Sequence, residues 1–74
     1  MYLDELVPGQ GGKIKVVQGT GLLRRRLLEM GLTPNTALKV RKVAPMGDPI
    51  EIYVRSYVLT LRKEDAHMIE VEVE

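Results

Sequence analysis

Hydrophobic and polar residues alternate along most of this chain, in the pattern that half-buried β-strands produce. The alternation is found in five segments, which are residues 13–18, 37–43, 50–55, 57–61 and 69–74. It is clearest in the third, where Ile50, Ile52 and Val54 would face a core and the residues between them would face solvent. The pattern therefore predicts a mainly β protein with five short antiparallel strands.

The first and last segments predict how the sheet begins and closes. In the first, Ile14 and Val16 would face inward between outward-facing lysines. Gly9, Gly11 and Gly12 precede this strand, and we interpret them as a flexible turn. The last segment is expected to pair beside the first, because closure into a barrel removes exposed strand edges.

Residues 23–34 depart from the β pattern and predict a short helix. Leu23, Leu27 and Met30 have the spacing of one helical face, which would pack on the barrel. Thr20 is a candidate N-cap for this helix.

The end of this helix is specified more firmly than its beginning. Gly31 suits the left-handed position that follows a helix, and Leu32 is then placed to pack back on Leu27. Pro34 prevents the helix from resuming. A lone helix in a β chain narrows the choice of fold.

Length and composition complete the prediction of the fold. The 74 residues are expected to form one domain, residues 1–74, with a small SH3-like antiparallel barrel, one inserted α-helix and a short helical turn within residues 62–68. The chain has no cysteine, its first residues lack the features of a signal peptide, and no apolar run is long enough to cross a membrane. We therefore expect a cytoplasmic protein without direct membrane insertion.

No arrangement of residues predicts catalysis. Residues 9–13 are rich in glycine, but Ile14 follows where a phosphate-binding loop has serine or threonine. Gly19 and Gly21 precede the helix, but Arg24 occupies the third glycine position of a dinucleotide fingerprint. With no cysteine and one histidine, no nucleophile–base pair can be assembled. We expect that the protein is not an enzyme and has no cofactor.

Glu64 and His67 are the candidate metal ligands, spaced i, i+3 on the predicted helical turn. Zinc would require three or four nitrogen or sulfur donors, and a facial iron triad would require a second histidine. A surface histidine beside solvated acids is the simpler interpretation. A metal site completed by a second molecule stays an alternative.

Three consecutive arginines, residues 24–26, raise the alternative of a small-barrel nucleic-acid-binding module. The net charge of +1 indicates no general attraction to nucleic acid. On a helix the three arginines fan over about 200° and do not form one patch. Only Tyr53 and Tyr57 are suitable for base stacking. We expect no nucleic-acid partner, and a pairing of Arg25 with Glu29.

Two stretches, in this order and spacing, resemble the FeoA family of bacterial and archaeal ferrous iron transport. They are RLLEMGL at residues 26–32 and APMGDPI at residues 44–50. The similarity covers nearly the whole chain, since LDELVPGQGGKIKVV resembles the opening segment of the family. Asn35 and Ser56 stand at turns where family members commonly have glycine, and of the two asparagine tolerates left-handed backbone better.

The resemblance implies an SH3-like barrel with a helical insertion and no catalytic activity. It also implies a cytoplasmic accessory protein that docks on and regulates FeoB, the membrane permease that carries a GTPase domain. The same fold forms the C-terminal domain of iron-dependent repressors, but this chain has no helix-turn-helix segment. The sequence leaves weak homo-oligomerisation and weak transition-metal binding open, and a ferrous-metal-binding regulator or chaperone stays an alternative function.

Docking requires an exposed surface, which we place around the end of the helix. The predicted apolar patch consists of Leu28, Met30, Leu32 and Met46. Arg24 and Arg25 would supply a basic rim for an acidic partner surface. The alternative is that all four apolar residues belong to the core.

Overall fold

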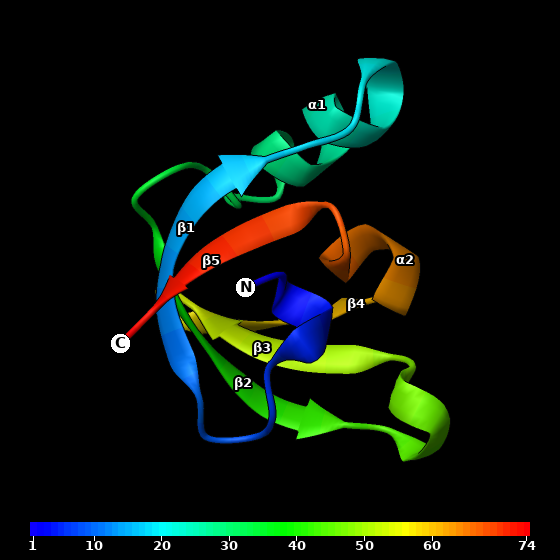
Figure 1. Ribbon diagram of the computed structural model, residues 1–74. Helices are drawn as coiled ribbons and strands as arrows, with labels where there is room; N and C mark the ends of the chain where they lie inside the picture. The colour runs from blue at the N-terminus through cyan, green and yellow to red at the C-terminus, as the bar shows by residue number, and fades with distance from the viewer.

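The computed structural model describes residues 1–74, which fold around a strongly curved sheet (Figure 1). Its strands are β1 Gly11–Val17, β2 Ala37–Val43, β3 Ile50–Val54, β4 Tyr57–Leu61 and β5 Ile69–Val73. They pair antiparallel in the order β4-β3-β2-β1-β5. The last strand therefore lies beside the first, and the small, mainly β SH3-like barrel is confirmed.

The helices lie at the ends of this barrel. Both predicted helices are present, as α1 Gly21–Glu29 and the one-turn α2 Lys63–Ala66. Two 3-10 turns, η1 Leu3–Glu5 and η2 Pro45–Gly47, complete the fold, and η1 packs beside α2. None of the helices has the length and apolar character needed to span a bilayer.

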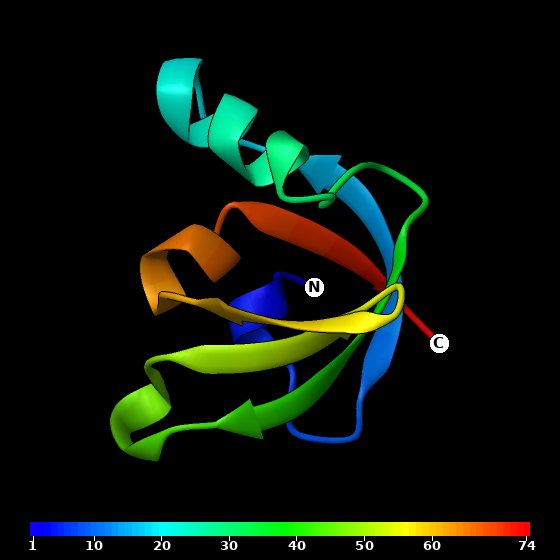
Figure 2. The same ribbon diagram turned by 180° about the vertical axis from the view of Figure 1, so that it is seen from behind.

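The barrel is open along one seam. β4 and β5 are the two edges of the sheet and form no ladder with each other. Figure 2 looks onto this seam, with α1 above it and α2 connecting the two edge strands. Besides the outer face of the sheet, the surfaces open to a partner are therefore the seam and the two helices beside it.

Fifteen buried aliphatic side chains fill the barrel. Ile50, Ile52 and Val54 point inward with at most 1% of their surface exposed, as predicted. The prediction for Val16 is wrong, because this residue is 40% exposed and Val17 is buried instead. The register of β1 against β5 shifts just before Val16, and such a bulge turns the following side chains to the opposite face.

Gly11 and Gly12 belong to β1, so their interpretation as a flexible turn before the strand is wrong. A Cβ atom on Gly12 would lie 2.0 Å from the backbone oxygen of Glu72 in β5. A Cβ atom on Gly11 would lie 2.4 Å from the backbone oxygen of Leu38 in β2. Glycine is required here because the neighbouring backbones approach too closely for any side chain.

Two turns show where left-handed backbone is needed. Asn35 has a φ of 72°, in agreement with the tolerance of asparagine for this conformation. In the hairpin between β3 and β4, Arg55 has a φ of 56°. Ser56 is not among the residues with positive φ, so serine fits this turn without strain.

Candidate functional site

Helix α1 projects from the barrel and carries three of the six predicted docking residues (Figure 1). Thr20 precedes it in an extended conformation, but its side chain makes no capping hydrogen bond. Leu27 anchors the helix and is fully buried, whereas Leu23 is half-buried. Leu22, in the first turn, is 82% exposed. The helix therefore presents an apolar residue to solvent at its start.

The end of α1 has the structure that the sequence predicts. Gly31 has a φ of 94°. The Leu32 amide donates to the Leu27 carbonyl at 3.2 Å, and the Gly31 amide donates to the Leu28 carbonyl at 3.0 Å. These two bonds form a Schellman motif, which turns Leu32 into the core with none of its surface exposed. The prediction that Leu32 belongs to an exposed patch is therefore wrong.

The other three members of the predicted patch do not share one surface. Leu28 and Met30 are half-buried and pack against the core. Met46 is 96% exposed on η2. In both views η2 lies at the opposite end of the molecule from α1 (Figures 1 and 2). The predicted contiguous patch is thus divided into a helix edge and an isolated methionine.

Each arginine of α1 has a partner inside the protein. Arg24 donates from Nε to a backbone carbonyl of β1 at 3.1 Å. Arg25 Nε lies 3.1 Å from Glu29 Oε1, which confirms the predicted pair. Arg26 Nη2 lies 3.6 Å from Asp65 Oδ2 in α2. The side chains of Arg25 and Arg26 stay mostly exposed, so their charges remain available at the surface.

Tyr57 connects the start of β4 to the end of α1. Its hydroxyl donates a hydrogen bond to the Met30 carbonyl. A Cβ atom on Gly31 would lie 2.7 Å from that hydroxyl and 3.7 Å from Arg55 Nε. The last carbonyls of a helix carry partial negative charge, which a hydroxyl donor and a guanidinium both complement. The position of α1 over the seam thus depends on a long-range contact.

We expect Tyr57→Phe to lower the free energy of unfolding by about 1 kcal/mol, because it removes one hydrogen bond and leaves the ring. Denaturant unfolding measures this change. Tyr53→Phe is the matched control, since the Tyr53 hydroxyl contacts the exposed side chain of Arg41 and should matter less. An equal effect of the two substitutions would contradict the anchoring role of Tyr57.

A groove of about 440 Å³ lies between α1 and α2, at the seam. It is lined by Leu23, Arg26, Arg62, Glu64, Asp65 and Met68. Asp65 is the one charged residue that is buried, and its ion pair with Arg26 joins the two helices across the groove. Arg62 and Glu64 pair at 3.7 Å with both side chains about three-quarters exposed. The groove therefore combines two apolar residues, Leu23 and Met68, with two ion pairs.

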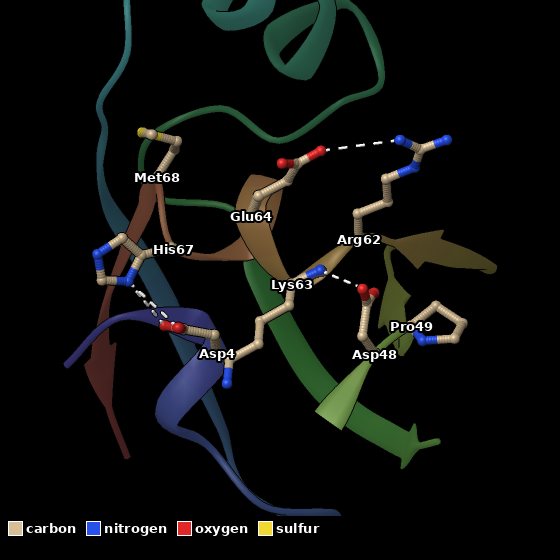
Figure 3. Close-up of a pocket in the computed structure, with 8 residues that line it drawn as sticks. All are labelled: Asp4, Asp48, Pro49, Arg62, Lys63, Glu64, His67 and Met68. Atoms are coloured by element: carbon tan, nitrogen blue, oxygen red, sulfur yellow. Dashed lines mark hydrogen bonds and ion pairs between the residues drawn. The ribbon is translucent and has the colours of Figure 1, made fainter. Parts of the chain in front are cut away.

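A wider pocket of about 830 Å³ contains the two candidate metal ligands (Figure 3). His67 Nδ1 lies 3.2 Å from Asp4 Oδ2 in η1, whereas Glu64 pairs with Arg62. The predicted neighbours Glu64 and His67 are therefore each paired elsewhere. No three histidine, aspartate or glutamate side chains are arranged to hold a metal ion. The pair of His67 and Asp4 ties α2 to the amino-terminal segment.

The two candidate stacking tyrosines are on different sides of the sheet. Tyr53 lies on the outer face, where Arg41 donates to its hydroxyl at 3.1 Å. Arg41 also pairs with Glu51 at 2.6 Å, and the hydrogen bonds to Tyr53 and Glu51 raise the pKa of its guanidinium. The Tyr57 hydroxyl is bound to the end of α1. The structure therefore does not bring together the stacking platform of a single-strand nucleic-acid module.

Sequence reasoning did not select Leu22 or Asp65. The exposure of Leu22 could have been predicted from the sequence, because this residue lies off the helical face that Leu23, Leu27 and Met30 share. Asp65 had none, since the adjacent acid Glu64 has the same character in the sequence and only the fold decides which is buried.

Comparison with known proteins identifies the relatives of this chain. The model of the FeoA domain family matches residues 1–73. A relative from Porphyromonas gingivalis (strain ATCC BAA-308 / W83), described as an Fe(2+) transport protein A/Fe(2+) transporter FeoB fusion protein, is 41% identical over 73 residues. That match covers 99% of this chain and 9% of the relative. The chain thus spans a small part of the length of that relative.

Solved structures of FeoA proteins have the same fold as this chain. Iron(II) transport protein A from Clostridium thermocellum matches with a TM-score of 0.93 and 42% identity, over 99% of this chain and 45% of that one. A crystal structure of an iron uptake regulatory protein (FeoA) matches with 0.92 and 31%, over 100% and 97%. Stenotrophomonas maltophilia FeoA, complexed with zinc and described as an SH3 domain protein, matches with 0.85 and 25%, over 97% and 89%. The fold of this chain is therefore the fold of these solved FeoA structures.

Proposed function

This chain belongs to the FeoA family of ferrous iron transport, and from that membership we propose that it is a non-catalytic cytoplasmic accessory protein that docks on a FeoB-type transporter and regulates it. One observation carries the proposal. In the Porphyromonas gingivalis relative, a segment 41% identical to nearly the whole of this chain is fused to the Fe(2+) transporter FeoB. Fusion keeps two domains at high local concentration, which favours a contact between them.

We place the docking surface on the exposed side of α1. This α1 surface consists of Leu22, Arg24, Arg25 and the half-buried Leu28. Leu22 offers an apolar side chain that is 82% exposed, and the exposed cation Arg25 follows three residues later on the same side of the helix. Arg24 is exposed on the other side of Arg25, next to Leu28. Apolar side chains with cations between them suit a partner surface that is apolar and acidic. Because Leu32 is buried and Met46 is distant, neither is part of this surface.

We expect Leu22→Glu to weaken association with the cytosolic domain of FeoB by at least about tenfold, or 1.4 kcal/mol, because it replaces the exposed apolar side chain with an acid that an acidic partner surface repels. Titration calorimetry with the two purified proteins measures the effect. Met46→Glu is the matched control, since it makes a similar change at a fully exposed residue far from α1. Neither substitution should alter the free energy of unfolding by more than about 0.5 kcal/mol.

Two results would contradict the proposal in different ways. No association of the unsubstituted chain with FeoB at micromolar concentration would remove the docking function itself. A greater loss with Met46→Glu than with Leu22→Glu would retain docking but move the surface from α1 to η2.

A further inference from the structure

Strand β4 is an uncovered edge of the sheet. It pairs along its length with β3, and no other element forms an extended contact with it. In the two-residue hairpin, Val54 faces Tyr57, so the alternation of the antiparallel ladder directs the backbone groups of Val58 and Thr60 away from β3. No backbone hydrogen bond outside the β3–β4 ladder involves residues 57–61. The amide and carbonyl groups of Val58 and Thr60 are therefore open to a further strand.

The other edge of the sheet is covered. Tyr2 forms a bridge with Glu70 in β5. The Val71 amide donates to the Met1 carbonyl at 2.6 Å, and the Met1 ammonium donates to the Val71 carbonyl at 3.2 Å. The amino-terminal residues thus occupy the hydrogen-bonding groups of β5. The two edges of the sheet therefore differ, because only the outward side of β4 has no neighbouring segment.

β4 lacks the charged residues and proline that often protect an edge strand. Its sequence, YVLTL, contains neither. Tyr57 is 40% exposed and Val58 is 44% exposed. An apolar edge of this kind favours β-strand addition, in which an extended segment pairs with the backbone.

The charges around β4 select the occupant. Arg55 precedes the strand, and Arg62 and Lys63 follow it. Arg62 shares its charge with the exposed Glu64 at 3.7 Å. A second copy of the chain paired antiparallel about Leu59 would bring Arg55 opposite Lys63, where like charges repel. A strand with acidic residues at its ends meets these cations favourably.

We propose that β4 binds an extended segment of the FeoB-type partner, with apolar residues at its centre and carboxylates near Arg55 and Arg62. The inference rests on the docking function proposed above and names the mode of contact. The added strand would lie along the seam beside α1, where Leu23 and Met68 supply apolar walls to the neighbouring groove. The same partner could then contact the α1 surface and the edge strand together.

Thr60→Pro is the decisive variant, because it removes an outward amide without removing a hydrogen bond to β3. We expect it to weaken binding of the FeoB cytosolic domain by at least about tenfold. Thr60→Val is the matched control, which changes the same side chain, keeps the amide, and should bind as the unsubstituted chain does. Arg62→Glu should also weaken binding, because it repels the carboxylates of the proposed segment. If the bound segment were basic instead, Arg62→Glu would strengthen binding and contradict the proposal.

Amide hydrogen exchange, followed by NMR, tests the same contact without any substitution. In the free protein the Val58 and Thr60 amides should exchange rapidly, whereas Leu59 and Leu61, bonded to β3, should be protected. Addition of the FeoB domain should slow exchange at Val58 and Thr60 by at least about tenfold. If Thr60→Pro does not fold, this exchange measurement alone decides whether a partner strand pairs with β4.

The outcomes separate the two proposals. Strand addition is overturned, and docking is retained, if two results are found together. Thr60→Pro binds the FeoB domain as well as the unsubstituted chain does, and the Val58 and Thr60 amides still exchange rapidly in the complex. Loss with Leu22→Glu in the same experiment would then assign docking to the α1 surface alone. No binding by the unsubstituted chain overturns both.

Discussion

Gly12→Ala is expected to lower the free energy of unfolding by at least about 3 kcal/mol, the largest effect of any single methyl group added to this protein. The new Cβ atom would lie 2.0 Å from the Glu72 oxygen and 3.0 Å from the Val73 Cα, and both are backbone atoms. Backbone atoms cannot rotate away, so β1 and β5 would have to separate. A chain of this length has a total stability of roughly 4–11 kcal/mol, and much of it would be lost.

Gly21→Ala is the matched control for this experiment. Gly21 has a φ of 60°, and nothing lies within 4 Å of a Cβ atom built on it. The substitution should therefore cost only the left-handed backbone penalty, about 1 kcal/mol. Urea unfolding of the two variants compares contact between backbones with conformational strain. If Gly12→Ala were the milder change, the close approach of β1 and β5 would be refuted.

Leu27→Ala should have the second largest effect, a loss of about 3–5 kcal/mol. Leu27 is the one residue of α1 that is fully buried, and it lies among the side chains of the barrel core. Its removal leaves a cavity that the sheet cannot close. The loss should appear in thermal unfolding as a fall in Tm of well over 10 °C, since about 1 kcal/mol shifts Tm by 4–8 °C in a domain of this size.

The same substitution on the other side of the helix provides the comparison. Leu22→Ala removes an equal side chain that is 82% exposed, and it should change the free energy of unfolding by less than about 0.5 kcal/mol. Both variants raise helix propensity by the same amount, so the difference between them reports burial alone. Similar losses in the two variants would contradict the orientation of α1.

The strands could be predicted from the sequence because their alternation is local. Ile50, Ile52 and Val54 follow the period of two, and the structure buries all three. Val16 could not be predicted, since the bulge that exposes it depends on pairing with β5, more than 50 residues away. The same holds for Gly12, whose role depends on the backbone across the sheet.

In the candidate site, too, local features could be predicted and long-range ones could not. The end of α1 could be predicted from the sequence, because Gly31 and Leu32 act through hydrogen bonds within one turn of the helix. Which apolar residues stay exposed was not, because burial of Leu32 and exposure of Met46 depend on how the helix and η2 lie on the barrel. The hydrogen bond of Tyr57 crosses 27 positions of the sequence and leaves no periodic signal.

The position of the carboxyl terminus has a consequence for tethering. The Glu74 amide donates to the Gly11 carbonyl at 3.0 Å, so β5 is held to its last residues. In both views the chain ends on the side of the barrel away from α1 and α2 (Figures 1 and 2). A linker that continued from Glu74 would leave the α1 surface unobstructed. It would need enough length to reach the other end of the barrel, and its effective concentration at the α1 surface would be highest when its span matches that path.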